Sequence, residues 1–220
     1  MRILALDTTA HFGSIALLED ERTLSELLLH APEGFSTILF DRVQRLLAQH
    51  GLSIGDIDVF ASASGPGSFT GVRLGLTAVK GLAEATGKPA FGVSNLQALA
   101  ECGTLPLRAA ILDARRGEIY GAVYDSAMNV VSQEVVTAFP NWLAGLPQTP
   151  DLEFVSTSFS PFQAALASSD FREHRVTEQR ALASAIARIA YRESKAGASP
   201  DPASLDANYI RRSDAELLFK

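Results

Sequence analysis

Short apolar segments separated by polar turns run through the first hundred residues. The segments Ile3–Asp7, Ser14–Leu18 and Thr23–His30 predict three β-strands, and Asp58–Ala63 and Ala90–Val93 predict two more. The fourth of these segments is predicted to be buried. The N-terminal part of the chain is therefore expected to contain a sheet.

Two longer segments carry apolar residues at helical spacing. Phe35–His50 places them along one face and is followed by Gly51, which predicts an amphipathic helix. Phe69–Thr86 predicts a long helix that ends at Gly87, and Ser94 is a suitable N-cap for a third helix. The first hundred residues therefore alternate predicted strands with predicted helices.

The second half of the chain opens with the same pattern as the first. Ala109–Asp113 repeats the apolar run and final carboxylate of Ile3–Asp7, and Glu118–Tyr124 corresponds to Ser14–Leu18. Two such units half a chain apart suggest an internal duplication, although a match of this length also arises by chance. The stretch 196–204 is rich in Ala, Ser, Pro and Asp and is interpreted as a linker.

Composition narrows the class of protein. The chain has 220 residues, 47% of them hydrophobic, with a formal net charge of −6 and a single cysteine, Cys102. The size supports a core without disulfides, the negative charge disfavours direct binding to a phosphate backbone, and a lone cysteine suits a reducing compartment. No apolar run reaches the length of a signal-peptide core or a membrane span, so a soluble, cytoplasmic protein is expected.

A glycine-rich loop precedes the long helix. The string from Ser64 to Gly71 joins a strand to a helix N-terminus, where free N–H groups attract anions. It lacks the lysine of a Walker loop, and its glycines are spaced one residue too wide for a dinucleotide fingerprint. Asp7, Thr8 and Thr9 are a second phosphate or Mg²⁺ candidate, matched by Asp113 in the second half. The simpler interpretation is that the glycines and carboxylates make turns.

The long helix is unusual in its glycine content, because each glycine inside a helix costs up to about 1 kcal/mol relative to alanine. One stripe of small residues comprises Gly71, Gly75, Ala78 and Gly81, and a second stripe comprises Val72, Leu76, Val79 and Ala83. We expect one stripe to face the protein's own sheet and the other to face outward toward a partner.

Metal and hydrolase motifs are absent from the sequence. None of the histidine pairs has the i, i+4 spacing that would hold zinc from one helix face, and there is no Gly-x-Ser-x-Gly motif. The four histidines are His11, His30, His50 and His174. A surface or structural role is expected for each.

Three motifs together resemble a known family. They are Ile3–Thr9, the string Ser64-Gly65-Pro66-Gly67-Ser68-Phe69-Thr70-Gly71-Val72-Arg73-Leu74-Gly75, and Asp113–Tyr120. In this order they resemble the TsaB (YeaZ) family, the small bacterial partner proteins of the enzyme that makes threonylcarbamoyladenosine in tRNA. The resemblance covers about the first 125 residues, and Asn208–Arg211 is similar to the family's C-terminal signature, while the stretch from about 128 to 203 adds little.

The resemblance implies an α/β fold of the actin-like type (the sugar kinase and Hsp70 superfamily), with two duplicated lobes of mixed sheets flanked by helices. We assign residues 1–103 to an N-terminal lobe and 104–204 to a C-terminal lobe. Residues 205–220 are expected to pack back on the N-terminal lobe.

The resemblance also implies a non-catalytic subunit. Such a subunit dimerises with TsaD, activates or stabilises it, and works with the ATPase TsaE. In TsaD a His-x-x-x-His pair holds the metal, and Asn95 and Leu99 stand at those two positions here, so no metal is expected. Contact with tRNA is expected to be indirect, through the complex, and the chain should bind neither a membrane nor a cofactor tightly. ATP or ADP with Mg²⁺ is expected only at the interface of the complex.

In the family, two helices of the N-terminal lobe contact TsaD and also form a competing homodimer; they correspond to Phe35–His50 and Phe69–Thr86. Family members often begin the first helix with His-Ser, whereas this chain has Phe35-Ser36. The expected interface residues are Phe35, Ile38, Leu39, Arg42, Val43, Leu46, Gly71, Arg73, Leu74, Gly75, Ala78 and Gly81. A second candidate site, for a nucleotide or for an interface shared with the partner, comprises Asp7, Thr8, Thr9, Gly65, Gly67, Ser68, Asp113 and Arg115.

The alternative function is an independent small-molecule kinase or ATPase of the same superfamily that uses Asp7, Thr8 and Asp113. It rests on the fold alone, and a fold hosts many activities. A protease has no supporting motif.

Overall fold

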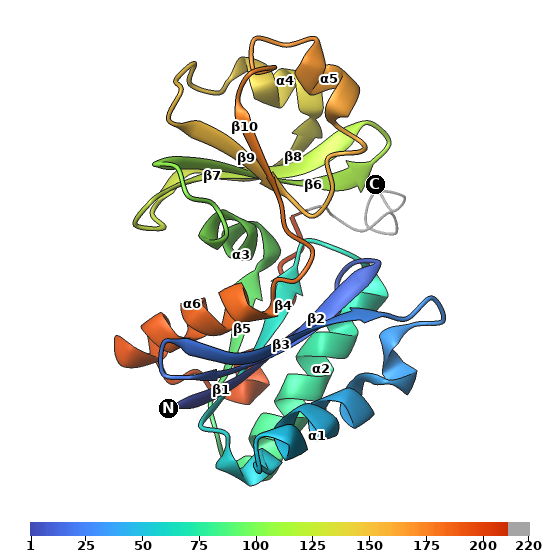
Figure 1. The fold of residues 1–220 in the computed structure, drawn as a ribbon, viewed down its shortest axis with the longest axis vertical. Coiled ribbons are helices and arrows are strands. Elements are labelled where there is room, and N and C mark those ends of the chain that lie inside the picture. Colours follow the sequence, from blue (N-terminus) through green and yellow to red (C-terminus); the bar gives the residue numbers. More distant parts are fainter. Residues whose placement is uncertain (211–220) are drawn as a thin grey trace, which may run out of the picture. The chain divides into compact units, whose positions relative to one another are not determined.

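The computed structural model describes residues 1–210, which form two compact units. Unit 1 comprises Met1–Ala98 and Arg180–Ala207, and unit 2 comprises Leu99–Gln179 with the described residues from Asn208 onward. The chain therefore leaves unit 1 after Ala98, forms most of unit 2, returns to unit 1 at Arg180 and passes to unit 2 again at Asn208 (Figure 1).

Unit 1 is built on a five-stranded mixed sheet with the order β3-β2-β1-β4-β5. The antiparallel pairs are β1–β2 and β2–β3, and the parallel pairs are β1–β4 and β4–β5. The strands are β1 (Arg2–Asp7), β2 (Phe12–Glu19), β3 (Arg22–His30), β4 (Val59–Gly65) and β5 (Ala90–Ser94).

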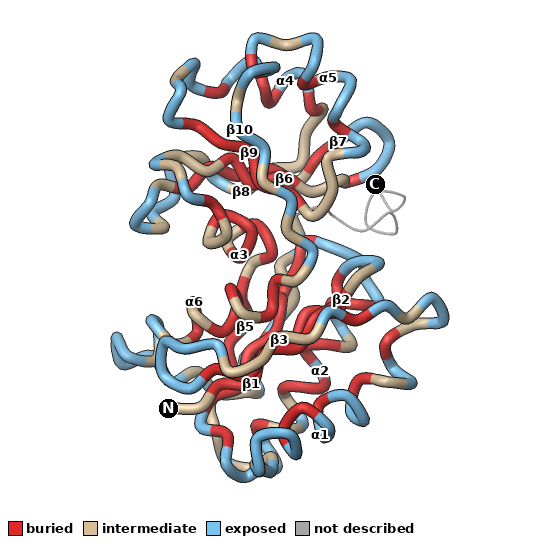
Figure 2. Tube along the Cα trace, in the orientation of Figure 1, coloured by how far each residue is buried: buried red, intermediate tan, exposed pale blue. Residues whose placement is uncertain are grey.

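Helices cover this sheet on both faces, which is why its central strands are apolar without alternation. Leu4 and Leu6 of β1 belong to a core cluster with α1 and α2, while Ile3 and Ala5, which point to the opposite face, are also fully buried. Helix α6 contacts β1, β2 and β4 and covers that second face (Figures 1 and 2). The continuous apolar run of β1 is thus explained by burial on two sides.

The helices of the chain vary in length. They are α1 (Leu39–Gln49), α2 (Phe69–Thr86), α3 (Asn95–Glu101), α4 (Phe139–Ala144), α5 (Gln163–Ala167) and α6 (Ala183–Lys195), with short 3₁₀ turns η1 (Phe35–Thr37), η2 (Ile54–Asp56) and η3 (Pro202–Ser204). Within residues 1–210, none of the helices is both long and apolar enough to cross a membrane.

Unit 2 contains a second five-stranded sheet with the order β10-β9-β6-β7-β8. Its antiparallel pairs are β6–β7 and β7–β8, and its parallel pairs are β6–β9 and β9–β10. The strands are β6 (Leu107–Arg115), β7 (Glu118–Asp125), β8 (Val130–Ala138), β9 (Leu152–Ser156) and β10 (Arg175–Glu178).

The two sheets have the same topology. Numbered within each unit, both place the strands in the order 3-2-1-4-5, with the same parallel and antiparallel pairs. The internal duplication and the actin-like fold class predicted above are therefore confirmed.

Two predicted element boundaries move by a few residues. The helix predicted from Phe35 begins as the 3₁₀ turn η1, and the α-helix proper begins at Leu39. Strand β4 extends to Gly65, which was assigned to the loop. Within the stretch from 128 to 203, strands β8, β9 and β10 and helices α4 to α6 were not predicted.

Helix α6 departs most from the predicted lobes, because it lies in unit 1 and not in a C-terminal lobe that extends to residue 204. Its first N–H groups are satisfied by side chains of unit 1. The Ser14 hydroxyl accepts hydrogen bonds from the N–H groups of Leu182 and Ala183, each at 3.0 Å, and the Glu26 carboxylate accepts from the N–H and hydroxyl of Ser184. These bonds and the buried face of α6 attach the segment that begins at Arg180 to unit 1. The first boundary between the two units also differs from the prediction, because it falls after Ala98 and not after residue 103.

The predicted C-terminal segment, 205–220, is described only in part. Leu205 is 8% exposed and joins the hydrophobic core of unit 1, as the expected packing on the N-terminal lobe requires. The side-chain amide of Asn208, in contrast, donates to Glu134 of unit 2 at 2.7 Å. Residues 211–220, including Arg211 of the C-terminal signature, lie outside the described residues.

Candidate functional site

The turn after β1 is buried, although it consists of polar residues. Asp7, Thr8 and Thr9 are 1%, 1% and 4% exposed. The Asp7 Oδ1 atom accepts hydrogen bonds from the Thr9 N–H at 2.9 Å and from the Thr9 hydroxyl at 2.6 Å. This carboxylate therefore holds its own turn in shape, as short carboxylates commonly do.

Asn95, the first residue of α3, joins this turn to the glycine-rich loop. Its Nδ2 donates to the Thr9 hydroxyl at 2.7 Å, and its Oδ1 accepts from the Gly65 N–H at 2.9 Å. Asn95 is 2% exposed, so both ends of its amide are used inside the protein. A single side chain thus connects the ends of three segments that are far apart in sequence.

The N-terminal part of α2 packs directly on the same turn. The Thr8 hydroxyl donates to the Gly71 carbonyl at 2.7 Å, and the Ser68 N–H donates to the Thr9 carbonyl at 2.7 Å. A β-carbon at Gly71 would overlap the carbonyl oxygen of Thr8, and a β-carbon at Gly67 would lie 2.8 Å from the carbonyl oxygen of Thr9. The glycines of the motif are therefore required by the close approach of two backbones, and Ser68 caps the helix.

Gly75, one turn further along α2, meets the sheet itself. A β-carbon there would lie 2.6 Å from the Ser62 Oγ and 2.8 Å from the Thr8 Oγ1. The small-residue stripe therefore faces inward at Gly71, Gly75 and Ala78, and only Gly81 is exposed. The second stripe, from Val72 to Ala83, is also buried. The expectation that one of the two stripes faces outward is wrong, because the two stripes adjoin on the helix and together form one broad buried face of α2, while the opposite face, with Arg73 and Gly81, is exposed.

The buried turn does not fit a nucleotide or Mg²⁺. Burial raises the pKa of the Asp7 carboxyl, against the lowering effect of the hydrogen bonds from Thr9 and Asn95. The Thr8 and Thr9 hydroxyls donate to groups of the protein, and the loop that contains Gly67 covers the turn. A phosphate would need exposed donors and a metal would need an exposed carboxylate, and unit 1 offers neither at this turn.

The matching turn in unit 2 is exposed. Asp113 Oδ1 accepts a hydrogen bond from the Arg115 N–H at 2.7 Å, and Asp113 Oδ2 lies 3.3 Å from the Arg115 guanidinium. The Arg115 side chain is 85% exposed. Arg115, Arg116 and Gly117 all have positive φ angles, of 66°, 58° and 79°, so Asp113 supports a tight left-handed hairpin turn. Asp7 and Asp113 each belong to one unit and each form a local turn.

The predicted partner-interface residues divide into a buried and an exposed group. Seven of them are buried in unit 1 and offer little surface to a partner: Phe35, Leu39, Val43, Leu46, Gly71, Gly75 and Ala78. The remaining five are exposed or partly exposed. Ile38 lies between η1 and α1, and Arg42 lies on α1. The other three, Arg73, Leu74 and Gly81, lie on α2. The apolar residues at helical spacing were correctly read as a helix face, but that face is the one against the sheet.

Two aromatic residues on the same helices were missed. Phe40 is 55% exposed and Phe69 is 52% exposed, and the Arg73 guanidinium lies over the Phe69 ring with its Cζ 3.9 Å from the ring centroid. Large exposed aromatic side chains commonly mark protein contacts. Phe40 lies outside the helically spaced set of buried apolar residues of α1. An apolar residue in such a position was the signal in the sequence that could have identified it as exposed.

The two positions compared with a metal-binding histidine pair hold no ligands. Leu99 is fully buried, and the Asn95 amide is occupied by Thr9 and Gly65. Within residues 1–210, no group of three or more histidine, cysteine, aspartate or glutamate side chains is arranged to hold a metal ion.

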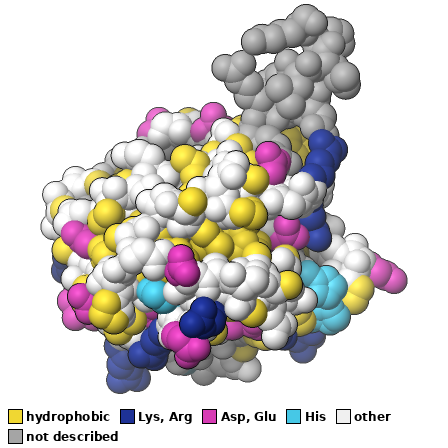
Figure 3. Space-filling view, turned by 90° about the horizontal axis from the view of Figure 1, so that it is seen from above, with side chains coloured by type: hydrophobic (Ala, Val, Ile, Leu, Met, Phe, Trp, Pro, Cys, Tyr) yellow, Lys and Arg dark blue, Asp and Glu magenta, His cyan; other side chains and the backbone are white. Residues whose placement is uncertain are grey.

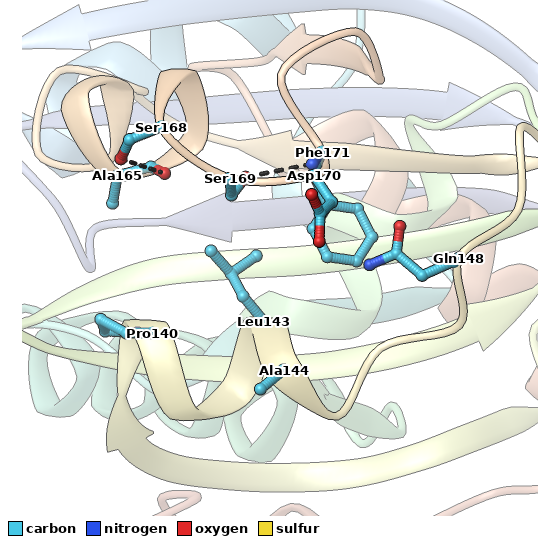
Figure 4. A pocket seen from close by; sticks show the side chains of 9 residues that line it. All are labelled: Pro140, Leu143, Ala144, Gln148, Ala165, Ser168, Ser169, Asp170 and Phe171. Atoms are coloured by element: carbon cyan, nitrogen blue, oxygen red, sulfur yellow. Dashed lines mark hydrogen bonds between the residues drawn. The ribbon is translucent and has the colours of Figure 1, made fainter.

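Unit 2 carries a pocket of about 340 Å³ between α4, α5 and the loop that follows α5 (Figure 4). Apolar side chains such as Leu143 and Phe171 form its base, and Gln148 and Asp170 lie at its polar side (Figure 4). Ser168 donates to carbonyls of α5, and Ser169 donates to the Leu166 carbonyl and accepts from the Phe171 N–H. These two hydroxyls therefore close the end of α5 and do not point to a ligand, which leaves Gln148 and Asp170 as the other polar side chains of the lining.

Comparison with known proteins identifies the family. The family model described as TsaD, tRNA N6-adenosine threonylcarbamoyltransferase, matches residues 30–199, which is more than half of the chain. The chain belongs to the TsaD family and is a homologue of TsaB (YeaZ).

The TsaB relatives match over the motif-rich part of the chain. The tRNA threonylcarbamoyladenosine biosynthesis protein TsaB of Escherichia coli is 40% identical over 134 residues, or 59% of this chain and 57% of that protein. The TsaB protein of Bacillus subtilis is 35% identical over 137 residues, or 61% of this chain and 60% of that protein. The matched segments thus span less than two thirds of the length of these relatives.

Solved structures extend the match to the whole fold. YeaZ from Pseudomonas aeruginosa superimposes with a TM-score of 0.78 at 25% identity, covering 94% of this chain and 99% of that one. An activator of 2-hydroxyisocaproyl-CoA dehydratase from Clostridium difficile, with bound ADPNP, has a TM-score of 0.53 at 10% identity, covering 90% of this chain and 97% of that one. The latter shares the fold alone.

Proposed function

We propose that this protein is a non-catalytic subunit in the biosynthesis of threonylcarbamoyladenosine in tRNA, next to the anticodon of tRNAs that read ANN codons. It acts by binding TsaD and activating or stabilising it. The names of the TsaB relatives support the pathway, and the residues at the Asn95 and Leu99 positions support the absence of catalysis. A leucine side chain has no atom that ligates a metal.

The outward side of α1 and α2 is the proposed docking surface for TsaD. The observation that carries this proposal is the pair of exposed aromatic residues, Phe40 and Phe69, on the helices that cover one face of the sheet in unit 1. Arg73 stacks on Phe69, and the side chain of Leu74 is partly exposed beside it in sequence. Aromatic and arginine side chains are the residues most enriched among those that dominate binding energy at protein interfaces.

A charge introduced at this surface tests the proposal. Phe40→Glu and Phe69→Glu should each weaken co-elution with purified TsaD in size-exclusion chromatography, because a buried carboxylate without a partner opposes binding. Val131→Glu, on β8 of unit 2, is a matched control, since Val131 is 54% exposed and lies outside both helices. If both phenylalanine variants and the control bind TsaD as the wild type does, the docking surface lies elsewhere.

Gly75 is not a suitable place for such a charge. A side chain there would collide with Ser62 and Thr8 inside unit 1, so a loss of binding would report misfolding and not a broken interface. The same two phenylalanine variants also test the proposed homodimer. If the homodimer uses this surface, its formation competes with binding of TsaD. Light scattering of the isolated protein should then show a smaller mass for Phe69→Glu than for Val131→Glu.

Other components of the proposed complex follow from this role. TsaE is the expected ATPase partner, and tRNA is expected to be contacted through the complex. Any ATP or ADP with Mg²⁺ would bind at the interface of the complex and not at the buried Asp7 turn of unit 1. With a net charge of −6, the chain alone should bind tRNA weakly at physiological salt. Tight binding that falls steeply with added salt would contradict this.

An independent kinase or ATPase is the alternative, and the geometry of Asp7 does not favour it. Its carboxylate is 1% exposed and its hydrogen bonds go to the protein's own turn. The purified chain is expected to turn over no ATP. ATP turnover by the purified chain that disappears in Asp7→Asn would support the alternative.

A further inference from the structure

Two histidines that are far apart in the sequence meet at the surface of unit 1. His11 immediately precedes β2 and His30 ends β3, and the β2–β3 register pairs Phe12 with His30. Their Nε2 atoms form a hydrogen bond of 2.9 Å, in which one ring nitrogen donates its proton to the other, and both residues are exposed. Histidine side chains gather on the surface in Figure 3, where they are coloured cyan.

The two rings converge and do not lie end to end. Their centroids are 4.6 Å apart and their planes are inclined by 66°. Two imidazoles bound at right angles to one metal, with metal–nitrogen bonds of about 2.0–2.1 Å, have nitrogens about 2.9 Å apart and centroids about 4.5 Å apart. Both distances in the structure agree with this arrangement, so a metal that replaces the hydrogen-bonded proton would need little movement of either ring. A tetrahedral site would separate the nitrogens by about 3.3–3.4 Å.

We propose that His11 and His30 form a two-histidine chelate for a divalent late transition metal that favours right-angled coordination, namely Ni²⁺ or Cu²⁺. Imidazole nitrogen is a preferred ligand of both ions, and right-angled positions are typical of both. The remaining coordination positions face solvent and take water. The site is independent of the proposed docking surface, because neither histidine lies on α1 or α2.

Phe12 holds the pair in this geometry. Its ring lies 5.1 Å from the His11 ring and 5.0 Å from the His30 ring, measured between centroids. The Arg180 guanidinium lies over the same phenyl ring, with its Cζ 5.2 Å from the centroid. The positive charge of Arg180 repels a metal cation bound nearby. The affinity for the metal therefore comes from its bonds to the two imidazole nitrogens and not from electrostatic attraction by this arginine.

Titration of the metal-free full chain with NiCl₂, followed by calorimetry, tests the proposal. One Ni²⁺ should bind per chain, and His11→Ala or His30→Ala should each weaken binding by about 10²-fold, because either loss removes the bivalent gain. The double variant should be little weaker than either single one, since a single variant already has only one ligand. His50→Ala is the matched control: His50 is also exposed, but its Nε2 pairs with the Ser25 hydroxyl at 2.7 Å.

Proton NMR of the imidazole rings gives a second measurement. Paramagnetic Ni²⁺ should broaden the ring signals of His11 and His30 at concentrations that leave those of His50 and His174 sharp. The proposal is overturned if the wild type binds no Ni²⁺ and no Cu²⁺ under these conditions. It is also overturned if His50→Ala weakens binding as much as His30→Ala, or if all four histidine signals broaden together. Because both chelating residues are exposed, each variant is expected to melt at nearly the wild-type temperature, and the melting curve verifies this.

Discussion

Asp7 is the last residue of β1 and Asp113 lies two residues before the end of β6, at corresponding places in two sheets with one topology, yet their surroundings differ. Asp7 is 1% exposed and its hydrogen bonds tie together a buried turn, while the side chain of Asp113 is 29% exposed and pairs with Arg115 at a hairpin tip. Equivalent positions in a duplicated fold have therefore taken different structural roles.

The connections between strands account for the difference. In unit 1 the crossover from β4 to β5 contains α2, with 18 residues, and the glycine-rich loop before α2 lies against the Asp7 turn. In unit 2 the corresponding crossover from β9 to β10 contains α5, with five residues. In this chain, the carboxylate of β1 is thus buried where the glycine-rich β4–β5 crossover packs on its turn, and the carboxylate of β6 stays partly exposed where the β9–β10 crossover contains only a short helix.

Gly71→Ala should break the buried turn most severely. The new β-carbon would overlap the Thr8 carbonyl, and neither backbone can move away easily, so we expect the free energy of unfolding to fall by about 3 kcal/mol or more. Gly81→Ala is the matched control in the same helix. It meets no atom within 4 Å and should stabilise the protein by up to about 1 kcal/mol. Urea unfolding of both variants checks the pair, and equal stabilities would refute the close approach.

Asn95→Ala should have the next largest effect. It leaves the Gly65 N–H buried without its acceptor and removes a donor to Thr9, which together should cost about 2–3 kcal/mol. Asn129→Ala is a suitable control, because Asn129 bonds to Asp125 at an exposed turn and its loss should cost less than about 1 kcal/mol. If the two variants are equally stable in urea, Asn95 does not join the turn to the loop.

Asp7→Asn should change how stability depends on pH. Because burial raises the pKa of Asp7, the folded protein binds this proton more tightly than the unfolded chain does. The contribution of Asp7 to stability is thus most favourable below the unfolded pKa of about 3.9 and is lost as the pH rises through the folded pKa, at up to about 1.4 kcal/mol per pH unit.

The difference in unfolding free energy between the wild type and Asp7→Asn is the quantity to follow. Measured from pH 4 upward, this difference should move against the wild type and then become constant. The asparagine can still accept from Thr9, so the variant should remain folded. A difference that instead grows in favour of the wild type would mean that hydrogen bonding outweighs burial at Asp7.

Much of the first half of the fold could be predicted from local patterns. The run Ile3–Asp7 and the helix Phe69–Thr86 have clear signals, because continuous apolar strands and a terminal Gly87 leave few alternatives. Helix α6 could not be placed, since its N-terminus is capped by Ser14 and Glu26, more than 150 residues earlier in the chain. Such pairings depend on tertiary structure and leave no local mark.

The candidate sites were predicted less well for a related reason. Helical spacing identifies an apolar face but does not say what covers it, and Gly75 faces Ser62 of the same unit and not a partner. The pairing of His11 with His30 depends on the register of a hairpin. A search for i, i+4 histidines within one helix could not find it.

Asp113→Asn should have the smallest effect and gives the sharpest contrast with the buried turn. The amide oxygen of asparagine can still accept from the Arg115 N–H, so the left-handed turn is retained and only the ion pair with Arg115 is lost. Exposed ion pairs contribute about 0–1 kcal/mol, so urea unfolding should give a change below about 1 kcal/mol. A loss of unfolding free energy as large as that of Asn95→Ala would mean that the turn in unit 2 stabilises the protein as much as the turn in unit 1 does. The length of the crossover would then not explain the difference between the two carboxylates.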